Sequence, residues 1–255
     1  MKIEVTAIIP AYNAERCLAR AVRSVLAQTV PCRAIIVNDA SSDGTLAVAE
    51  RYLAEYPKYV SIINNEKNQG VAVSRNHAAE MAETEYIAYL DADDWWSVEK
   101  LELQLKKLRE SGADACYSGR ELMTAEGETT GRVVHVPEGT SYKKLLKGNV
   151  IPCSSVLVKR QAALEYPMAH DELHEDYITW LSMLRDGKQF VGIDEPLLKS
   201  GLGEDGKSRK KGRSAKMTFG VYRYMGIPVW MACYYFCCYA LAGVRKYAGM
   251  KNKRK

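Results

Sequence analysis

Residues 86–94 read YIAYLDADD, a run of five hydrophobic residues closed by three aspartates. Such a run is typical of a buried strand, and the aspartates mark the point where the chain leaves the sheet. Three carboxylates within four residues repel one another unless a cation lies among them. Oxygen ligands suit Mg²⁺ and Mn²⁺, which bind through one or two carboxylates and through substrate phosphates. We therefore expect a divalent-cation site here, although capping of a helix through Trp95-Trp96 remains the alternative for Asp94.

Strands and helices alternate through the ninety residues that lead up to this stretch. Short β-branched runs indicate the strands, and helical spacing of hydrophobic residues indicates the helices. The predicted strands are 4–10, 34–38, 60–64 and 86–90, and the predicted helices between them are 15–28, 44–54 and 71–82. Alternation with short links is typical of an α/β fold, in which helices flank a mostly parallel sheet.

Polar side chains follow each of the four predicted strands. They are Tyr12-Asn13, Asn38-Asp39, Asn64-Asn65 and the aspartates of 91–94. In open α/β sheets, ligands bind beyond the carboxyl ends of the strands. We therefore expect these four clusters to lie at the ligand site.

The pattern changes after Asp94. Helical and strand patterns become shorter, and the links between them become longer. The predicted elements are a helix at 98–110, a strand at 115–118, a hairpin over 121–136, a strand at 156–158, a helix at 176–186 and a mobile Gly- and Lys-rich loop at 201–213.

Three further motifs have both a functional and a structural interpretation. Asp39 has a carboxylate suited to a base or ribose, but the turn NDASSDGT at 38–45 needs such residues anyway. The planar guanidinium of Arg75 can donate paired hydrogen bonds to phosphate oxygens, although an arginine exposed to solvent fits this position of the sequence equally. Glu175-Asp176 begins a predicted helix, where a carboxylate is either a cap or a general base at an open first turn.

Taken together and in this order, these motifs resemble those of the family 2 glycosyltransferases with the GT-A fold. The resemblance runs from Val5 to Leu198, about three quarters of the chain. Its segments are IIPAYN at 8–13, SVLAQT at 24–29, VNDAS at 37–41, NQG at 68–70 with Arg75-Asn76, LDADD at 90–94 and Glu175-Asp176. Ala40 departs from the glycine that the family often has. No Gln-x-x-Arg-Trp element follows Asp176, which favours transfer of one sugar over the building of a long polymer.

The resemblance implies roles for residues of this chain. Asp176 is the implied general base, and Glu175 is implied to orient it. Asp91 and Asp93 are implied to hold the donor diphosphate through Mn²⁺ or Mg²⁺, with Asp93 as the more direct ligand. The residues implied to bind the nucleotide sugar are Pro10, Tyr12, Asn13, Asp39, Asn68, Arg75 and Asp91.

The resemblance also implies a reaction, in which an inverting, metal-dependent enzyme moves a single sugar from a nucleotide sugar, such as a UDP-sugar, to an acceptor hydroxyl. The implied catalytic domain is 1–200, with a nucleotide-sugar-binding half at 1–97 and an acceptor half at 98–200. One alternative is a metal-dependent nucleotidyltransferase, which usually opens with a Gly-rich loop that Ala11–Ala14 does not provide. The other is a non-catalytic scaffold that binds sugar nucleotides or membranes.

Residues 201–255 form a basic tail with a net charge of +11, behind a body of net charge −6. Within this tail, 225–244 carries no charged side chain. Pro228 and the many aromatic residues favour a helix that lies in a membrane interface, with a buried core helix or a membrane-spanning helix as alternatives. Basic flanks fit an anionic lipid surface. Because no basic-aromatic recognition motif is present, we expect no nucleic-acid partner.

Relatives with this layout commonly extend bacterial surface polysaccharides, such as capsule or O-antigen, on a lipid carrier. The resemblance therefore implies a lipid-linked saccharide acceptor. Met1–Pro10 has the pattern of a strand rather than of a signal peptide. The seven cysteines contain no Cys-x-x-Cys pair, which is typical of free thiols in a reducing compartment. We therefore expect a peripheral protein on the cytoplasmic face of the inner membrane.

Overall fold

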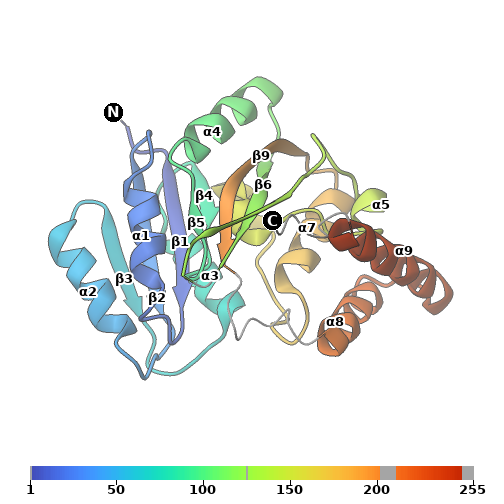
Figure 1. The fold of residues 1–255 in the computed structure, drawn as a ribbon, viewed down its shortest axis with the longest axis horizontal. Helices are drawn as coiled ribbons and strands as arrows, with labels where there is room; N and C mark the ends of the chain where they lie inside the picture. The colour runs from blue at the N-terminus through green and yellow to red at the C-terminus, as the bar shows by residue number, and fades with distance from the viewer. Residues whose placement is uncertain (1, 125, 202–210, 249–255) are drawn as a thin grey trace.

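The computed structural model describes residues 2–124, 126–201 and 211–248, which fold around one nine-stranded sheet (Figure 1). The sheet order is β3-β2-β1-β4-β8-β6-β9-β5, and β7 pairs with β6 outside this path. The strands are β1 (Val5–Ala11), β2 (Cys32–Asn38), β3 (Val60–Asn64), β4 (Tyr86–Tyr89), β5 (Trp95–Trp96), β6 (Ala115–Met123), β7 (Thr129–Val134), β8 (Leu157–Lys159) and β9 (Phe190–Gly201). The helices are α1 (Leu18–Leu26), α2 (Thr45–Glu55), α3 (Val71–Met81), α4 (Lys100–Ser111), α5 (Tyr142–Leu145), α6 (Arg160–Glu165), α7 (Glu175–Arg185), α8 (Lys211–Tyr224) and α9 (Val229–Ala248), with a 3-10 turn η1 at Cys153–Ser155. The predicted α/β fold is confirmed.

The two halves of the sheet pair differently. Strands β3, β2, β1 and β4 run parallel, as the alternation of strands and helices predicts. In the other half, β8 is antiparallel to both β4 and β6, and β9 is parallel to β6 but antiparallel to β5. The sheet as a whole is therefore mixed, and its parallel half contains all four strand ends with polar clusters.

Helices cover both faces of the parallel half. Val5, Ala7 and Ile9 of β1 face a core that α1, α2 and α4 complete, whereas Ile8 faces a core that α3, α6 and α7 complete. All four side chains are fully buried. Burial on both faces explains why the parallel strands are almost continuously hydrophobic. Polar side chains therefore collect at the strand ends, where the sheet is not covered.

The second half departs from the sequence prediction, because no strand is predicted where β9 lies. β9 contains Pro196 together with charged residues, and its register against β6 shifts between Ser118 and Arg120. Proline has no N–H for the sheet ladder and is tolerated at such irregularities. β6 also continues to Met123 instead of ending at 118. The pairing of β6 with β9 therefore depends on tertiary contacts that local periodicity does not report.

The predicted loop at 201–213 is only partly described. Residues 202–210 lie outside the described residues. The chain is already helical from Lys211, where α8 begins. The prediction of a loop is therefore wrong for 211–213, because these residues form the first turn of a helix that buries one face in its later turns.

The two C-terminal helices pack into the same core as α7. Tyr222 of α8 and Ala232 of α9 are fully buried in it. Gly226, with a φ of 76°, and Pro228 separate the two helices. Among the helices of the described ranges, none combines the length and the hydropathy that crossing a bilayer needs.

Candidate active site

The carboxyl ends of the parallel strands bring the predicted polar clusters to one edge of the sheet. Ala11 at the end of β1 is in register with Asn38 at the end of β2, which is in register with Asn64 at the end of β3. The next residues along each strand are those singled out in the sequence. Tyr89 at the end of β4 is in register with Ile8 of β1, so the fourth cluster follows at the same edge. The four clusters therefore share one edge of the sheet, and their role in ligand binding stays a prediction.

Asn13 ties the end of β1 to the turn after β2. Its Oδ1 accepts a hydrogen bond of 2.9 Å from the main-chain N of Ser42. Asn13 and Ala40 have φ values of 49° and 56°, in the left-handed region. Glycine adopts this region without a steric penalty, which explains the glycine that the family often has at the position of Ala40. Tyr12 is exposed beside this turn and Pro10 is partly exposed, so both rings are accessible to a ligand.

Asp39 links the end of β2 to the start of α3. Its side chain accepts hydrogen bonds from Asn65 Nδ2 at 2.8 Å and from the main-chain N of Gln69 and Gly70, both at 2.9 Å. Asn68 Nδ2 donates to the main-chain O of Asp39 at 3.3 Å. Asp39 is 4% exposed. A carboxylate has about four acceptor sites, so one remains for the nucleoside contact that the resemblance implies.

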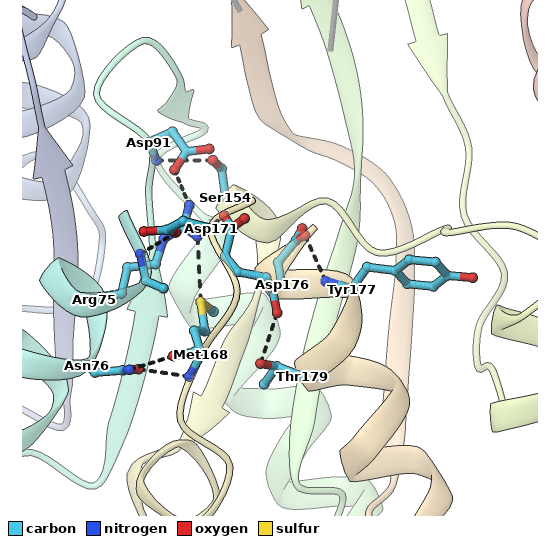
Figure 2. Close-up of polar contacts among 11 residues, drawn as sticks. Arg75, Asn76, Asp91, Ser154, Met168, Asp171, Asp176, Tyr177 and Thr179 are labelled. Atoms are coloured by element: carbon cyan, nitrogen blue, oxygen red, sulfur yellow. Dashed lines mark hydrogen bonds and ion pairs between the residues drawn. The ribbon is translucent and has the colours of Figure 1, made fainter. Parts of the chain in front are cut away.

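Arg75 bridges two acidic residues that lie far apart in the sequence. Its Nη2 lies 2.6 Å from Asp91 Oδ1 (Figure 2). Its Nη1 lies 2.9 Å from Glu175 Oε1. Arg75 is 2% exposed, so the solvated arginine that the sequence left open is wrong. A buried guanidinium needs such charge-assisted partners because desolvation of a lone charge is costly. Arg75 therefore joins the end of β4 to the start of α7.

The aspartates after β4 have three different surroundings. The main-chain N of Asp91 donates to Ser154 Oγ at 3.1 Å, and the Asp91 carboxylate is partly exposed. Asp93 is exposed. Asp94 is 8% exposed, and its Oδ1 accepts a hydrogen bond of 3.1 Å from the main-chain N of Gly201 in β9. Trp95–Trp96 form β5 rather than a helix, so the alternative of a helix cap for Asp94 is wrong.

The aspartates after β4 repel one another, and a divalent cation bound among them would offset this repulsion. Although Asp93 reaches the surface, its pKa is raised, first because neighbouring protein displaces part of the water around its carboxyl group and then by the charge of Asp91. The pKa of Asp94 is raised to about 7, first by burial and then by the charges of Asp93 and Asp91. A cation between Asp91 and Asp93 would relieve this repulsion with hard oxygen ligands. Within the described ranges, no group of three or more His, Cys, Asp or Glu side chains converges as a metal site. Ions such as Mg²⁺ usually bind through one or two carboxylates together with substrate phosphates.

Asp176 lies in the first turn of α7, directly after Glu175. The pKa of Asp176 is raised to about 7, first by burial and then by the charge of Glu175, whereas Arg75 lowers it. Its Oδ1 accepts a hydrogen bond of 2.7 Å from the main-chain N of Tyr177 (Figure 2). The residue as a whole is partly exposed, in an open first turn of the helix. A carboxyl group with a pKa near neutrality and access to solvent can accept a proton in a reaction.

Several residues around this site are absent from the sequence prediction. Ser154 binds Asp91, and Asp171 binds the start of α3. Asn76, which the resemblance includes without a role, binds Met168 through two hydrogen bonds. Ser154 lies in the short 3-10 turn η1 and Asp171 in an irregular segment, where no periodic pattern marks them, so only the fold brings them to the site.

The profile of the family described as "Glycosyl transferase family 2" matches residues 6–163, a segment that contains the parallel strands from Thr6 onward and the aspartates after β4, but neither β9 nor Glu175-Asp176. The chain belongs to glycosyl transferase family 2. The match bears out the family that the sequence motifs resemble, and it makes this protein a glycosyltransferase.

Relatives of this glycosyltransferase extend over nearly its whole length. It is 35% identical over 244 residues to "Putative teichuronic acid biosynthesis glycosyltransferase TuaG" of Bacillus subtilis, which covers 95% of this chain and 96% of the relative. It is 30% identical over 256 residues to "UDP-Glc:alpha-D-GlcNAc-diphosphoundecaprenol beta-1,3-glucosyltransferase WfgD" of Escherichia coli, with 98% of each chain covered. These names place its relatives among enzymes of bacterial surface polysaccharides.

Solved structures share the fold of this glycosyltransferase at low sequence identity. The mannosyltransferase PcManGT from Pyrobaculum calidifontis, in complex with GDP-Man and Mn²⁺, matches with a TM-score of 0.72 and 17% identity, over 99% of this chain and 77% of its own. TarS of S. aureus, in complex with UDP-GlcNAc, matches with a TM-score of 0.71 and 17% identity, over 87% of this chain and 65% of its own. The predicted GT-A fold is thereby confirmed.

Proposed function

We propose that this glycosyltransferase moves a single sugar, with inversion and with the help of a divalent cation, from a UDP-sugar to a hydroxyl of a lipid-linked saccharide. The observation that carries the proposal is the double ion pair of Arg75. One guanidinium binds both Asp91, beside the proposed cation site, and Glu175, which is next to the proposed base. One side chain therefore joins an aspartate of the proposed cation site to the residue next to the proposed base, which supports a shared site.

Asp91 and Asp93 would hold Mn²⁺ or Mg²⁺ against the donor diphosphate. When bound, the cation would neutralise the negative charge of the leaving nucleoside diphosphate. The names of two fold neighbours support this reading, because PcManGT was solved with GDP-Man and Mn²⁺ and GalNAc-T7 with UDP, GalNAc and Mn²⁺. The proposed contacts to the rest of the donor come from Pro10, Tyr12, Asn13, Asp39, Asn68 and Arg75.

Asp176 would take the proton of the acceptor hydroxyl as that oxygen attacks the anomeric carbon. The bond from this carbon to the diphosphate oxygen breaks as the new glycosidic bond forms, and attack from the opposite face inverts the anomeric centre. Glu175 binds Arg75 rather than Asp176, so its proposed orienting effect on the base acts through charge. General-base catalysis of this kind accelerates a reaction by about 10²–10⁴-fold.

The C-terminal helices support the proposed membrane partner, and a relative supports the proposed acceptor class. Trp230, Leu241 and Val244 of α9 are 74%, 60% and 66% exposed. Helical spacing puts them on one face, opposite the buried Ala232 and Tyr235. An exposed apolar face behind a basic tail fits an anionic lipid surface. The WfgD relative is named for a diphosphoundecaprenol-linked acceptor, and a lipid-linked saccharide would be presented at such a surface.

The proposed location is peripheral, on the cytoplasmic face of the inner membrane, where nucleotide sugars and lipid-linked saccharides meet. All seven cysteines are free, as the sequence predicts for a reducing compartment. In the proposed division, residues 1–97 bind the donor, 98–200 provide the base and the acceptor site, and 201–255 contact the lipid. No nucleic acid takes part in this scheme.

A donor panel tests the reaction. The enzyme is incubated with UDP-sugars and with a lipid extract of bacterial membranes, in Mn²⁺, in Mg²⁺ and in EDTA, and free UDP is measured. We expect lipid-dependent release of UDP that EDTA abolishes, and NMR of the product should show an inverted anomeric centre. Release or consumption of pyrophosphate would support a nucleotidyltransferase instead, and retention of configuration would contradict the role of Asp176.

Flotation with liposomes tests the membrane contact. Leu241→Glu places a charge on the exposed face of α9, and Leu53→Glu places the same charge on an exposed apolar position of α2. We expect Leu241→Glu to lower binding to vesicles that contain phosphatidylglycerol, and Leu53→Glu to leave it unchanged. Equal binding by both variants would contradict the contact through α9.

A further inference from the structure

The segment between α6 and α7, residues 166–174, is anchored on helix α3. Asn76 makes a reciprocal pair with Met168, in which Nδ2 donates to the main-chain O at 2.7 Å and Oδ1 accepts from the main-chain N at 2.9 Å (Figure 2). Three residues later, Asp171 Oδ1 accepts a hydrogen bond of 2.9 Å from the main-chain N of Ala72. The segment that leads into the proposed base is therefore held on α3 at two points.

Asp171 lies against the start of α3, where residue 70 is a glycine with a backbone conformation that other residues rarely adopt. A Cβ on Gly70 would lie 1.9 Å from Asp171 Oδ2, and the φ of Gly70 is 89°. The first N–H groups of a helix have no partner within it, and the helix dipole favours a negative charge there. The Asp171 carboxylate therefore satisfies the start of α3 and fills the space that a side chain on Gly70 would need.

Helix α3 binds one acid from each half of the molecule, and it does so twice. At its start, Asp39 from the donor half accepts a hydrogen bond of 2.9 Å from the main-chain N of Gly70. Asp171 from the other half accepts one of 2.9 Å from the main-chain N of Ala72. One turn later, Arg75 pairs with Asp91 from the donor half and with Glu175 from the other half. Helix α3 thus contacts both the donor aspartates and the start of α7.

We propose that Asp171 is a positioning residue for the general base. By binding the start of α3, Asp171 holds residues 166–174, and with them the first turn of α7, at a fixed distance from the donor site. This role rests on the proposed function of Asp176. Asp171 takes no part in binding the donor or in the proton transfer itself.

The expected effect of losing this contact is on the rate and not on donor binding. A misplacement of about 1 Å in a reacting group lowers a rate by about 10²-fold. In Asp171→Ala we expect kcat to fall about 10- to 100-fold while the KM for the donor and the Kd for UDP change less than about twofold. In Asp171→Asn, a side-chain oxygen can still accept from Ala72 N, and we expect kcat to stay within about fivefold of wild type.

The test measures kcat, donor KM, UDP affinity by calorimetry and Tm for each variant of the full chain. Glu172→Ala is the matched control, because Glu172 is the next carboxylate of the same segment and pairs with His170 inside that segment. We expect this control to keep wild-type kcat. If Asp171→Ala does not fold, Asp171→Glu replaces it, because the longer carboxylate cannot sit against Gly70 without moving the segment.

A folded Asp171→Ala or Asp171→Glu with wild-type kcat would overturn the positioning role, as would a change in donor KM without a change in kcat. Equal loss of kcat in Asp171→Asn and Asp171→Ala would also overturn it, because the carboxylate charge itself would then be needed for chemistry. The proposed function fails separately, if the wild-type enzyme releases no nucleoside diphosphate with any donor.

Discussion

Two acidic clusters meet at Arg75, and they resemble each other in composition more than in surroundings. In each cluster one carboxylate pairs with Arg75, namely Asp91 in one and Glu175 in the other. In each, a neighbouring carboxyl group, Asp94 or Asp176, has a pKa raised to about 7, first by burial. Asp94, however, is buried and bound by the main chain of β9, whereas Asp176 keeps partial exposure at the start of a helix. A shifted pKa therefore marks both groups, and only access to solvent separates a structural acid from a candidate base.

The largest expected effect is on kcat, and it distinguishes Asp176 from Asp94, the two carboxyl groups with a raised pKa. Asp176→Asn removes the proposed base but keeps the size of the side chain, and we expect kcat to fall by about 10²–10⁴-fold. Asp94→Asn keeps an acceptor for the main chain of Gly201, and we expect kcat to fall less than about fivefold. UDP release at saturating donor and acceptor measures both. Similar losses of kcat in the two variants would contradict the proposed difference between Asp176 and Asp94.

Removal of the Arg75 guanidinium, which pairs with both acidic clusters, tests how much this double ion pair stabilises the fold. Arg75→Met leaves Asp91 and Glu175 without their partner inside the protein, and the loss of one member of a buried ion pair costs about 3–5 kcal/mol. Arg33→Met is the control, since Arg33 pairs with Glu83 at 3.2 Å on the surface, where both side chains are well exposed, and such a pair contributes about 0–1 kcal/mol. Urea unfolding measures both free energies. A cost below about 1 kcal/mol for Arg75→Met would show that the bridge is not a stabilising element.

The pH dependence of the rate identifies whether the reaction depends on the raised pKa of Asp176 or on that of Asp94. A base with a pKa of about 7 has to be ionised, so kcat/KM should be constant above pH 7 and fall about tenfold per pH unit below it. Asp94→Asn should keep this profile. A profile that flattens in Asp94→Asn would assign the kinetic pKa to the buried acid and contradict the comparison.

The smallest expected effect concerns stability. The pKa of Asp94 is higher in the folded chain than its ordinary value of 3.8, so the folded protein binds more protons than the unfolded one between about pH 4 and pH 7. Stability is therefore lost as the pH rises through this window. We expect Asp94→Asn to be more stable than wild type by about 1–2 kcal/mol at pH 8 and equal to it at pH 4, because the amide carries no charge to bury. Thermal unfolding at the two pH values measures this, and a gain of the same size at pH 4 would contradict the cause.

The donor half is readable from local sequence because its structure is local. Hydrophobic runs such as Tyr86–Leu90 are buried on both faces of a parallel sheet, and the polar residues that end them are forced to one edge by the strand direction. The departure from glycine at Ala40 is also visible in the sequence. The structure gives its physical meaning, because Ala40 has a φ of 56°, a conformation that favours glycine. By contrast, β9 with Pro196 has no period that a local pattern detects.

The sequence alone determined the α/β class, the four polar strand ends and the acidic motifs that the family shares, because each depends on residues within a few positions of one another. Only the tertiary structure decided that Arg75 is buried between two acids, that Asp94 is bound by β9 and that Asp171 binds the start of α3. These contacts join residues that are 16 to 107 positions apart. Burial and charge at such distances arise from how the helices and strands pack, and no periodicity along the chain reports them.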